Sequence, residues 1–228
     1  MNITENIRHL EARLTELSIP SVPARLVAVT KTKPIETLLE AYGAGCRRFG
    51  ENKVQELAAK YEALPKDIEW HLIGHLQTNK VKYVAPFVHL IHSVDSLKLL
   101  QEIDKQAARY HRVQDCLLQL HIAQEETKFG LSEAEAQALL CSDELTALRH
   151  VRVVGLMGMA SNTENEAQIC GEFRGLKHFF DKMKIERGAK PNVELRELSM
   201  GMSGDWPLAV QEGSTLIRVG SALFGARN

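Results

Sequence analysis

The chain has 228 residues, of which 44% are hydrophobic and 25% charged, and its formal net charge is −1 at pH 7. This balance is typical of a globular protein, and it excludes a general electrostatic attraction to nucleic acid or to an anionic membrane surface. No apolar run approaches the ~18 residues that a membrane span requires.

The N-terminal segment predicts an amphipathic helix within residues 1–19. Apolar residues recur every three or four positions from Ile3 to Leu17, with charged residues between them. We expect this helix to pack on the main body rather than on a membrane, because its polar face is not especially basic. Pro20 and Pro23 end it.

From Leu26 onward, short apolar runs alternate with helical patterns. The predicted strands lie near residues 26–31, 47–50, 69–73, 88–92, 115–122, 151–157, 195–199 and 215–219. The predicted helical segments lie near residues 34–44, 52–63, 77–84, 95–112, 132–140, 164–186 and 204–212. This order is that of an α/β TIM-type (β/α)8 barrel, and a doubly wound open sheet is the main alternative. We find no linker, so residues 1–228 predict one domain.

Lys31 follows the first predicted strand, where an apolar run gives way to a proline that opens a helix. In a barrel, this position puts the aliphatic stem in the interior and the amine at the rim of the C-terminal mouth. Partial desolvation there favours the neutral amine, which is the form that attacks a carbonyl. The alternative is a solvated lysine that caps the strand.

The loops after the last two predicted strands contain small residues, Ser203 with Gly204 and Gly220 with Ser221. Barrels often bind phosphate with these two loops, through backbone N–H groups and hydroxyls. Arg218 either faces outward in an ion pair or faces inward toward a ring nitrogen or a phosphate. A ligand with both an aldehyde and a phosphate could bind to the lysine and to the two loops at once. Two candidates are pyridoxal 5′-phosphate (PLP) and the sugar phosphate of a Schiff-base aldolase.

Nine histidines raise the question of a metal site. The pairs His71–His75 and His89–His92 lie in predicted strand regions, where neither spacing aligns two ligands, and no cysteine or carboxylate cluster completes them. We therefore expect no metal. The sequence also lacks a P-loop, a G-x-S-x-G motif and a strand-linked G-x-G-x-x-G motif.

The cysteines form no C-x-x-C pair, and we expect them to be free thiols in a reducing compartment. The N-terminus is acidic and is not followed by a hydrophobic signal segment. The cytoplasm is therefore the expected location.

A set of motifs occurs in order over nearly the whole chain from Leu26. These motifs are AVTKTKP (28–34), FGENKVQE (49–56), WHLIGHLQTNK (70–80), GLM (155–157), LSMGMS (198–203), IRVGS (217–221) and FGAR (224–227). Together they resemble the pyridoxal phosphate homeostasis protein family (YggS/PROSC type). The resemblance implies a PLP-binding barrel like the N-terminal domain of alanine racemase, with PLP attached to Lys31 as an internal aldimine.

The resemblance also implies the other cofactor contacts. The expected cofactor-binding residues are Lys31, Asn52, Ser199, Met200, Ser203, Arg218, Gly220 and Ser221. Ser203, Gly220 and Ser221 would hold the phosphate, with Ser199 and Met200 in support, while Arg218 would face the pyridine ring. Asn52 and the loop of residues 74–75 would line the mouth, and Lys33 would lie close to Lys31. Residues 204–207 depart from the family pattern, which leaves the start of the next helix open.

Two features favour a homeostasis protein over an enzyme. A racemase needs a second base, which related racemases take from a tyrosine of a further domain, and this chain has no room for that domain. Its tyrosines fall in predicted helices, at positions 42, 61, 83 and 110. An arginine opposite the pyridine nitrogen would also weaken the ring as an electron sink. We therefore expect PLP to be held without strong turnover.

The expected partners are PLP and PLP-dependent apo-enzymes, without nucleic acid or membrane, and the expected state is a monomer. One alternative is a small PLP-dependent amino-acid racemase or lyase with Lys33, Lys128 or His75 as its second base. Another is a binding module that regulates partner proteins and carries a vestigial pocket.

Overall fold

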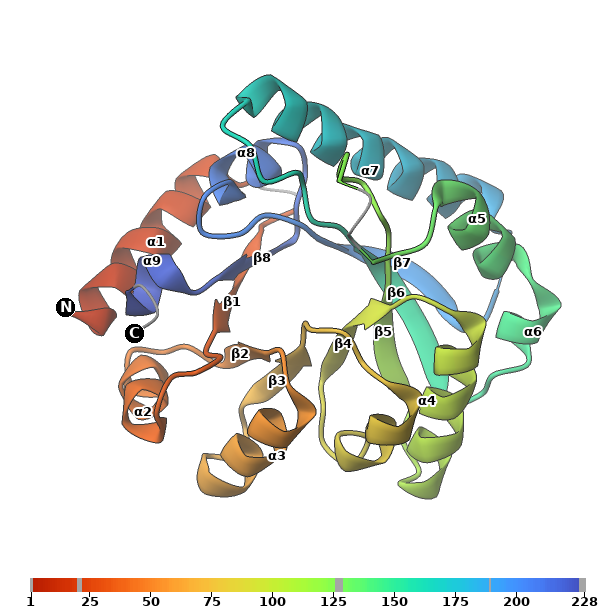
Figure 1. The fold of residues 1–228 in the computed structure, drawn as a ribbon, viewed down its shortest axis with the longest axis horizontal. Coiled ribbons are helices and arrows are strands. Elements are labelled where there is room, and N and C mark those ends of the chain that lie inside the picture. The colour runs from red at the N-terminus through yellow and green to blue at the C-terminus, as the bar shows by residue number, and fades with distance from the viewer. Residues whose placement is uncertain (1, 20–21, 126–128, 189, 226–228) are drawn as a thin grey trace.

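Eight parallel strands close into a barrel in which each strand pairs with the next along the chain and β8 pairs with β1 (Figure 1). The computed structural model describes residues 2–19, 22–125, 129–188 and 190–225. The strands are β1 (Arg25–Val29), β2 (Arg48–Glu51), β3 (Glu69–Leu72), β4 (Leu90–Val94), β5 (Gln114–Gln119), β6 (Val151–Met157), β7 (Val193–Ser199) and β8 (Leu216–Val219). The predicted barrel is thus confirmed, and the open sheet is excluded.

Helices surround the barrel (Figure 1). They are α1 (Ile3–Leu17), α2 (Ile35–Gly43), α3 (Val54–Ala63), α4 (Leu97–Arg109), α5 (Glu133–Cys141), α6 (Asp143–Thr146), α7 (Glu166–Glu186), α8 (Trp206–Gln211) and α9 (Ser221–Phe224). The predicted helical segment at 77–84 is a 3₁₀ helix, Thr78–Tyr83. Helix α6, a single turn capped by Ser142, lies between two predicted elements and was not expected from the sequence.

Several helices begin at a residue whose side chain caps the first turn, namely α1, α4, α5, α6 and α7. Helix α5 begins at a capping box, in which the Ser132 hydroxyl accepts from the Glu135 N–H and the Glu135 carboxylate accepts from the Ser132 N–H.

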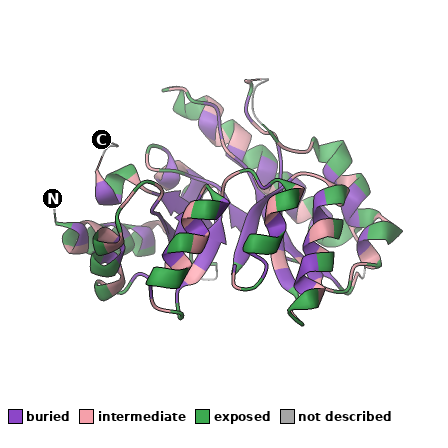
Figure 2. Ribbon diagram, turned by 60° about the horizontal axis from the view of Figure 1, so that its bottom comes forward, coloured by how far each residue is buried: buried purple, intermediate pink, exposed green. Residues whose placement is uncertain are grey.

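The strands are largely buried, as expected where helices cover the outer face of a parallel barrel and side chains fill its interior. Figure 2 shows this pattern, with buried strands and helices that are exposed on their outer side.

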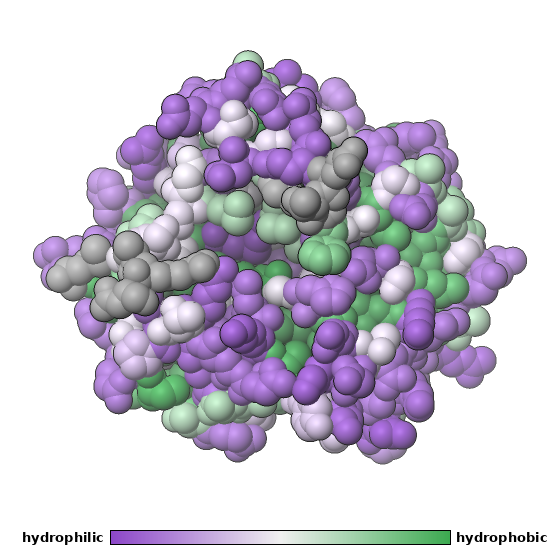
Figure 3. All heavy atoms as spheres, in the orientation of Figure 1, coloured by the Kyte–Doolittle hydropathy of each residue, from purple (hydrophilic) through white to green (hydrophobic). Residues whose placement is uncertain are grey.

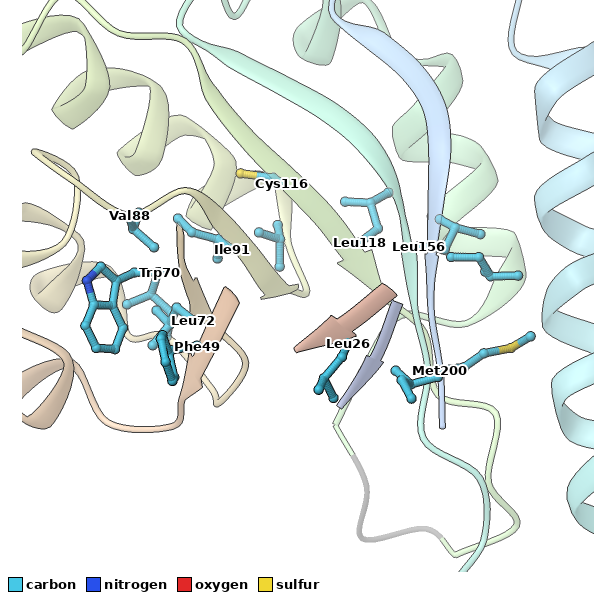
Figure 4. Packing of buried hydrophobic residues seen from close by; sticks show 14 of the residues in the cluster. Leu26, Phe49, Trp70, Leu72, Val88, Ile91, Cys116, Leu118, Leu156 and Met200 are labelled. Carbon is cyan, nitrogen blue, oxygen red and sulfur yellow. The ribbon is translucent and has the colours of Figure 1, made fainter. Parts of the chain in front are cut away.

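The hydrophobic core has two layers. The larger one lies between the sheet and the helices and includes Trp70 and Phe49, whose ring centroids are 5.9 Å apart (Figure 4). The smaller one fills the barrel and consists of Val27, Leu90, Leu117, Val154, Met157 and Leu216. Truncating a fully buried residue such as Trp70 to alanine would cost about 3–5 kcal/mol.

Ion pairs occupy the mouth at the N-terminal ends of the strands. Arg48 pairs with Glu69 at 2.9 Å and Arg152 pairs with Asp115 at 2.7 Å, while Arg25 pairs with Glu197. Since these charges satisfy one another, the opposite mouth is the place where a ligand site is expected.

Helix α1 lies beside α8 and α9 (Figure 1). It buries Ile7 completely, and the Asn6 side chain donates to the carbonyl of Leu223 at 2.9 Å. This contact ties the first helix to the last one. No helix within the described part of the chain is long and apolar enough to cross a membrane.

Candidate functional site

A cavity of about 310 Å³ opens at the C-terminal ends of the strands. Its lining comes from the segments that follow β1, β2, β3, β6, β7 and β8. The lining residues are Val29, Lys31, Lys33, Asn52, Ile73, Met159, Met202, Ser203, Gly204, Arg218, Gly220, Ser221 and Gly225. Segments far apart in the sequence therefore build one site. Figure 3 shows the molecule in the orientation of Figure 1, with hydrophilic residues dominating the surface and hydrophobic ones in smaller areas between them.

The cavity brings together most of the predicted cofactor-binding residues. Those in the lining are Lys31, Asn52, Ser203, Arg218, Gly220 and Ser221. Ser199 and Met200 are fully buried and do not belong to the described lining. Met200 packs in the outer hydrophobic layer, where Figure 4 labels it, and its backbone N–H donates to the carbonyl of Leu216 at 3.2 Å.

The two lysines of the K-T-K motif both line the cavity. The ammonium of Lys33 donates to the carbonyl of Phe224 at 2.9 Å and lies 3.5 Å from that of Gly225, so it contacts the C-terminal end of α9. Lys31 is half-buried in a tight turn that closes where the Lys33 N–H donates to the Thr30 carbonyl at 3.0 Å. The position of Lys33 is thus linked to α9, and that of Lys31 is linked to the end of β1.

The loops after β7 and β8 are joined to each other. The Gly220 N–H donates to Oγ of Ser203 at 3.2 Å, and the Arg218 N–H donates to the Gly201 carbonyl at 2.9 Å. Gly201 has φ = 94°, and a Cβ there would lie 2.6 Å from Cβ of Ala209. The turn therefore requires glycine. These contacts place the hydroxyl of Ser203 beside Gly220 on the cavity wall.

Arg218 points into the barrel, which decides between the two orientations that the sequence left open. It is 4% exposed, and its guanidinium donates to Oγ of Ser199 at 2.6 Å and to the carbonyl of Gly158 at 3.1 Å. Burial lowers the pKa of Arg218 to about 10, while Asp205 acts in the opposite direction. The group is therefore still a cation at neutral pH, and it borders the cavity from below.

A chain of hydrogen bonds continues from Arg218 through the barrel interior. Oγ of Ser199 lies 2.9 Å from Nδ1 of His92, and Nε2 of His92 lies 2.8 Å from Nδ1 of His71. Burial lowers the pKa of both histidines well below the ordinary value, so both are neutral.

Arg218 has donors only, so Oγ of Ser199 accepts from it, and the Ser199 hydroxyl has one proton with which to donate in turn. If the Ser199 hydroxyl donates a hydrogen bond to Nδ1 of His92, then the proton of His92 is on Nε2, and this N–H donates to Nδ1 of His71. These proton positions are assigned from the hydrogen-bond network. It leaves the remaining proton on Nε2 of His71, a buried atom that has no hydrogen-bond partner among the described residues.

The two histidines were considered only as metal ligands in the sequence analysis. Their contact crosses from β3 to β4, where His71 is in register with Leu90. One set of potential metal ligands does occur within the described ranges: ligand atoms of Glu69, His71 and His89 lie within 4.8 Å of one another. The carboxylate of Glu69 is, however, already paired with Arg48 at 2.9 Å.

Asn52 lines the cavity and contains a buried polar atom. Its Oδ1 is buried and has no hydrogen-bond partner in the part of the chain that the structure describes. A buried amide oxygen of this kind is costly unless a ligand or water satisfies it. Gly74 packs directly on Asn52, since a Cβ at position 74 would lie 2.4 Å from the Asn52 carbonyl oxygen.

The candidate second bases lie elsewhere, except Lys33. His75 is exposed, pairs with Asp95 at 3.5 Å and stacks on Phe129, and it does not belong to the lining. Lys128 lies outside the described residues. The tyrosines are also absent from the described lining, and Tyr42, for example, donates to Asp67 at 2.9 Å.

The family description "Alanine racemase, N-terminal domain" matches residues 1–228. Curated relatives are the pyridoxal phosphate homeostasis proteins of Aquifex aeolicus, which is 43% identical over 205 residues (90% of this chain and 87% of that protein), and of Haemophilus influenzae, which is 36% identical over 235 residues (100% and 97%). These relatives have the name of a homeostasis protein and not that of an enzyme.

Solved structures agree. PipY of Synechococcus elongatus with PLP bound superposes with a TM-score of 0.85 at 39% identity, covering 98% of this chain and all of that one. Alanine racemase of Bartonella henselae, which has covalently bound pyridoxal phosphate, gives a TM-score of 0.71 at 18% identity, covering 99% of this chain and 58% of that one, and it shows the fold alone. The chain therefore belongs to the pyridoxal phosphate homeostasis protein family, on a barrel of the alanine racemase N-terminal type.

Proposed function

We propose that this protein binds PLP in the cavity, attaches it covalently to Lys31 and serves PLP homeostasis without strong catalytic turnover. The observation that carries the proposal is that Lys31 and the loops of Ser203 and Ser221 line the same cavity. An aldehyde and a phosphate of one small molecule can therefore be held at once.

The residues present fit this group. The buried Oδ1 of Asn52 lacks a partner among the described residues, and the cavity of about 310 Å³ is within the usual size for a small ligand. PLP would supply an aldehyde that condenses with a primary amine, with release of one water per covalent bond. Lys31 would supply that amine.

The remaining roles follow from position. The hydroxyls of Ser203 and Ser221 would hold the phosphate, and Gly220, whose N–H donates to Oγ of Ser203, would leave room for its oxygens because it has no side chain. Arg218 would donate to the pyridine nitrogen. Its positive charge disfavours protonation of that nitrogen, and this weakens the electron sink that amino-acid chemistry needs.

The arrangement gives little support to a racemase or lyase. Within the described lining, Lys33 is the remaining side chain that could act as a second base, and its ammonium donates to the Phe224 carbonyl. A base that must accept a proton from a substrate is poorly served by that contact. Stable retention of PLP is the chemistry that this cavity supports best.

The proposal extends to the setting of the protein. The described cysteines are all free thiols, which agrees with action in the cytoplasm. We further propose a monomer that exchanges PLP with PLP-dependent apo-enzymes, because one chain supplies both the lysine and the phosphate-binding loops.

The test is borohydride reduction of the PLP-loaded protein, followed by mass mapping of the modified lysine. We expect the label on Lys31, its loss in Lys31→Ala, and its retention in Lys33→Ala. A label that persists in Lys31→Ala would assign the attachment to another lysine. Incubation with alanine, serine or threonine enantiomers in deuterated water tests the enzyme alternative, since α-deuterium incorporation at turnover rates would contradict a homeostasis role.

A further inference from the structure

Thr32, the residue after Lys31, has an unusual backbone conformation. Its φ is 66°, and among the described residues other than glycine only His111 shares a positive φ. A β-branched side chain is strained in this left-handed region, so the surrounding contacts must hold it there. This torsion adjoins Lys31, so it fixes the path of the backbone in the turn that carries Lys31.

The contact that holds Thr32 comes from α3. Its N–H donates to Oε1 of Glu56 at 2.6 Å, and the same oxygen accepts from the ammonium of Lys60 at 2.7 Å. Partial burial acts to raise the pKa of Glu56, but the hydrogen bonds from Lys60 and from the Thr32 N–H outweigh it and lower the pKa overall. Glu56 is therefore a carboxylate at neutral pH and a strong acceptor.

The other neighbour of Lys31 is bound by the same ammonium. Lys60 is 5% exposed, and it also donates to the carbonyl of Thr30 at 2.8 Å and to Oε1 of Glu51 at 2.7 Å. The hydroxyl of Thr30 donates to that Glu51 oxygen at 2.6 Å. The three N–H donors of Lys60 are thus directed at three acceptors, which is the full capacity of an ammonium group.

These residues flank Lys31 without entering the cavity. None of Thr30, Thr32, Glu51, Glu56 and Lys60 belongs to the described lining. Any effect of these residues on the cavity is therefore transmitted through neighbours that line it, of which Lys31 lies between Thr30 and Thr32. A cluster of two carboxyl groups and one ammonium, in which Glu51 and Lys60 are buried and Glu56 is partly buried, is expensive to assemble, and its contacts converge on the two residues beside Lys31.

We propose that Glu56 and Lys60 are positioning residues for Lys31, and that they act by holding Thr32 in its left-handed conformation so that the Lys31 amine is aimed into the cavity. This inference rests on the proposed role of Lys31. Removal of the Glu56 carboxylate leaves the Thr32 N–H without its acceptor, and the backbone then relaxes toward negative φ. Glycine has no such preference, because it adopts positive φ at no steric cost.

The experiment measures the rate of covalent attachment of PLP, by its visible absorbance, in the full chain. We expect Glu56→Ala to lower this rate about tenfold to a hundredfold, the size of a small misplacement of a reacting group, and Glu56→Gln, which retains an acceptor oxygen, to lower it less. Glu62→Ala, on the exposed side of the same helix, is the matched control and should leave the rate unchanged.

The decisive readout is rescue. In the Thr32→Gly background, Glu56→Ala should lower the rate much less than in the native background, as a double-mutant cycle would show. Affinity for pyridoxamine 5′-phosphate, which cannot attach, should stay within about twofold in all variants, because the phosphate and ring contacts are unchanged. A purely structural role of Glu56 would lower both quantities and would not respond to Thr32→Gly.

Two results would overturn the inference and leave the proposed function intact: an unchanged rate in Glu56→Ala, or a slowed rate that Thr32→Gly does not restore. Persistence of the label in Lys31→Ala would instead contradict the proposed function. Since Glu56→Ala leaves Lys60 its contacts to Thr30 and Glu51, we expect the variant to fold, and a thermal melt checks this. Lys60→Met is a second variant, in which a smaller loss of rate is expected because Glu56 still accepts from the Thr32 N–H.

Discussion

Arg218 and Ser199 are joined by a 2.6 Å hydrogen bond from the guanidinium to the hydroxyl oxygen, at the boundary between the cavity and the barrel interior. The bond fixes the plane of the guanidinium, because a second donor of the same group reaches the carbonyl of Gly158 at 3.1 Å. Because two donors of the guanidinium are bound in this way, the orientation of the edge that faces the cavity is fixed before a ligand binds.

Ser199→Ala should therefore weaken PLP binding without preventing its attachment to Lys31. The substitution leaves one buried donor of Arg218 unsatisfied, which should lower the free energy of unfolding by about 1–3 kcal/mol. Urea unfolding and titration with PLP measure the two effects. The control is Ser214→Ala, since the Ser214 hydroxyl is also buried but donates to the Met200 carbonyl at 2.7 Å. If both variants lose PLP affinity equally, the effect of Ser199 is one of general stability.

The buried histidine pair predicts a loss of stability on mild acidification. Because burial lowers the pKa of His71 and His92 well below 6.5, the unfolded chain binds more protons than the folded one as pH falls below that value. The free energy of unfolding should thus fall by up to about 1.4 kcal/mol per histidine and pH unit in that window. Chemical unfolding between pH 7.5 and 5.5 measures it.

The comparison needs a variant, because Glu51 acts in the opposite direction: burial raises its pKa, which favours the folded state at low pH and opposes it as pH rises. A variant with His71→Gln and His92→Gln together should have a flatter pH profile than the native chain. His178→Gln, at an exposed position of α7, should retain the native slope. An equal slope in all three proteins would show that the histidine pair does not titrate as inferred.

The sequence predicted the barrel well because apolar runs and helical periodicity are local signals. It predicted β4 two residues too early, however, so His92 was the last residue of the predicted strand, whereas it is the middle residue of β4. The contacts of His92 with His71 and Ser199 cross between strands and depend on strand register, which no local pattern encodes. Arg218 was left undecided for a related reason, since alternation along a strand shows that two faces exist but not which one is the interior.

The phosphate assignment predicts a selective change in ligand preference. In the double variant Ser203→Ala and Ser221→Ala, affinity for PLP should fall about tenfold or more, because hydroxyl donors to a charged group are lost. Affinity for pyridoxal, which has no phosphate, should change little and is the internal control. Equal losses for both ligands, measured by absorbance titration, would contradict this assignment.

Gly74→Ala should disturb the site through the contact of Gly74 with Asn52. The added Cβ would lie 2.4 Å from the Asn52 carbonyl oxygen and 2.7 Å from its Cα, and both are backbone atoms that cannot rotate away. We expect Asn52 to shift, PLP affinity to fall, and the free energy of unfolding to drop by about 1–3 kcal/mol. Gly171→Ala is the matched control: a Cβ there meets nothing within 4 Å in helix α7, so the substitution should stabilise the chain by up to about 1 kcal/mol and leave PLP affinity unchanged. Thermal melts with PLP titration measure both, and a Gly74→Ala protein with native affinity would show that Asn52 does not contact the ligand.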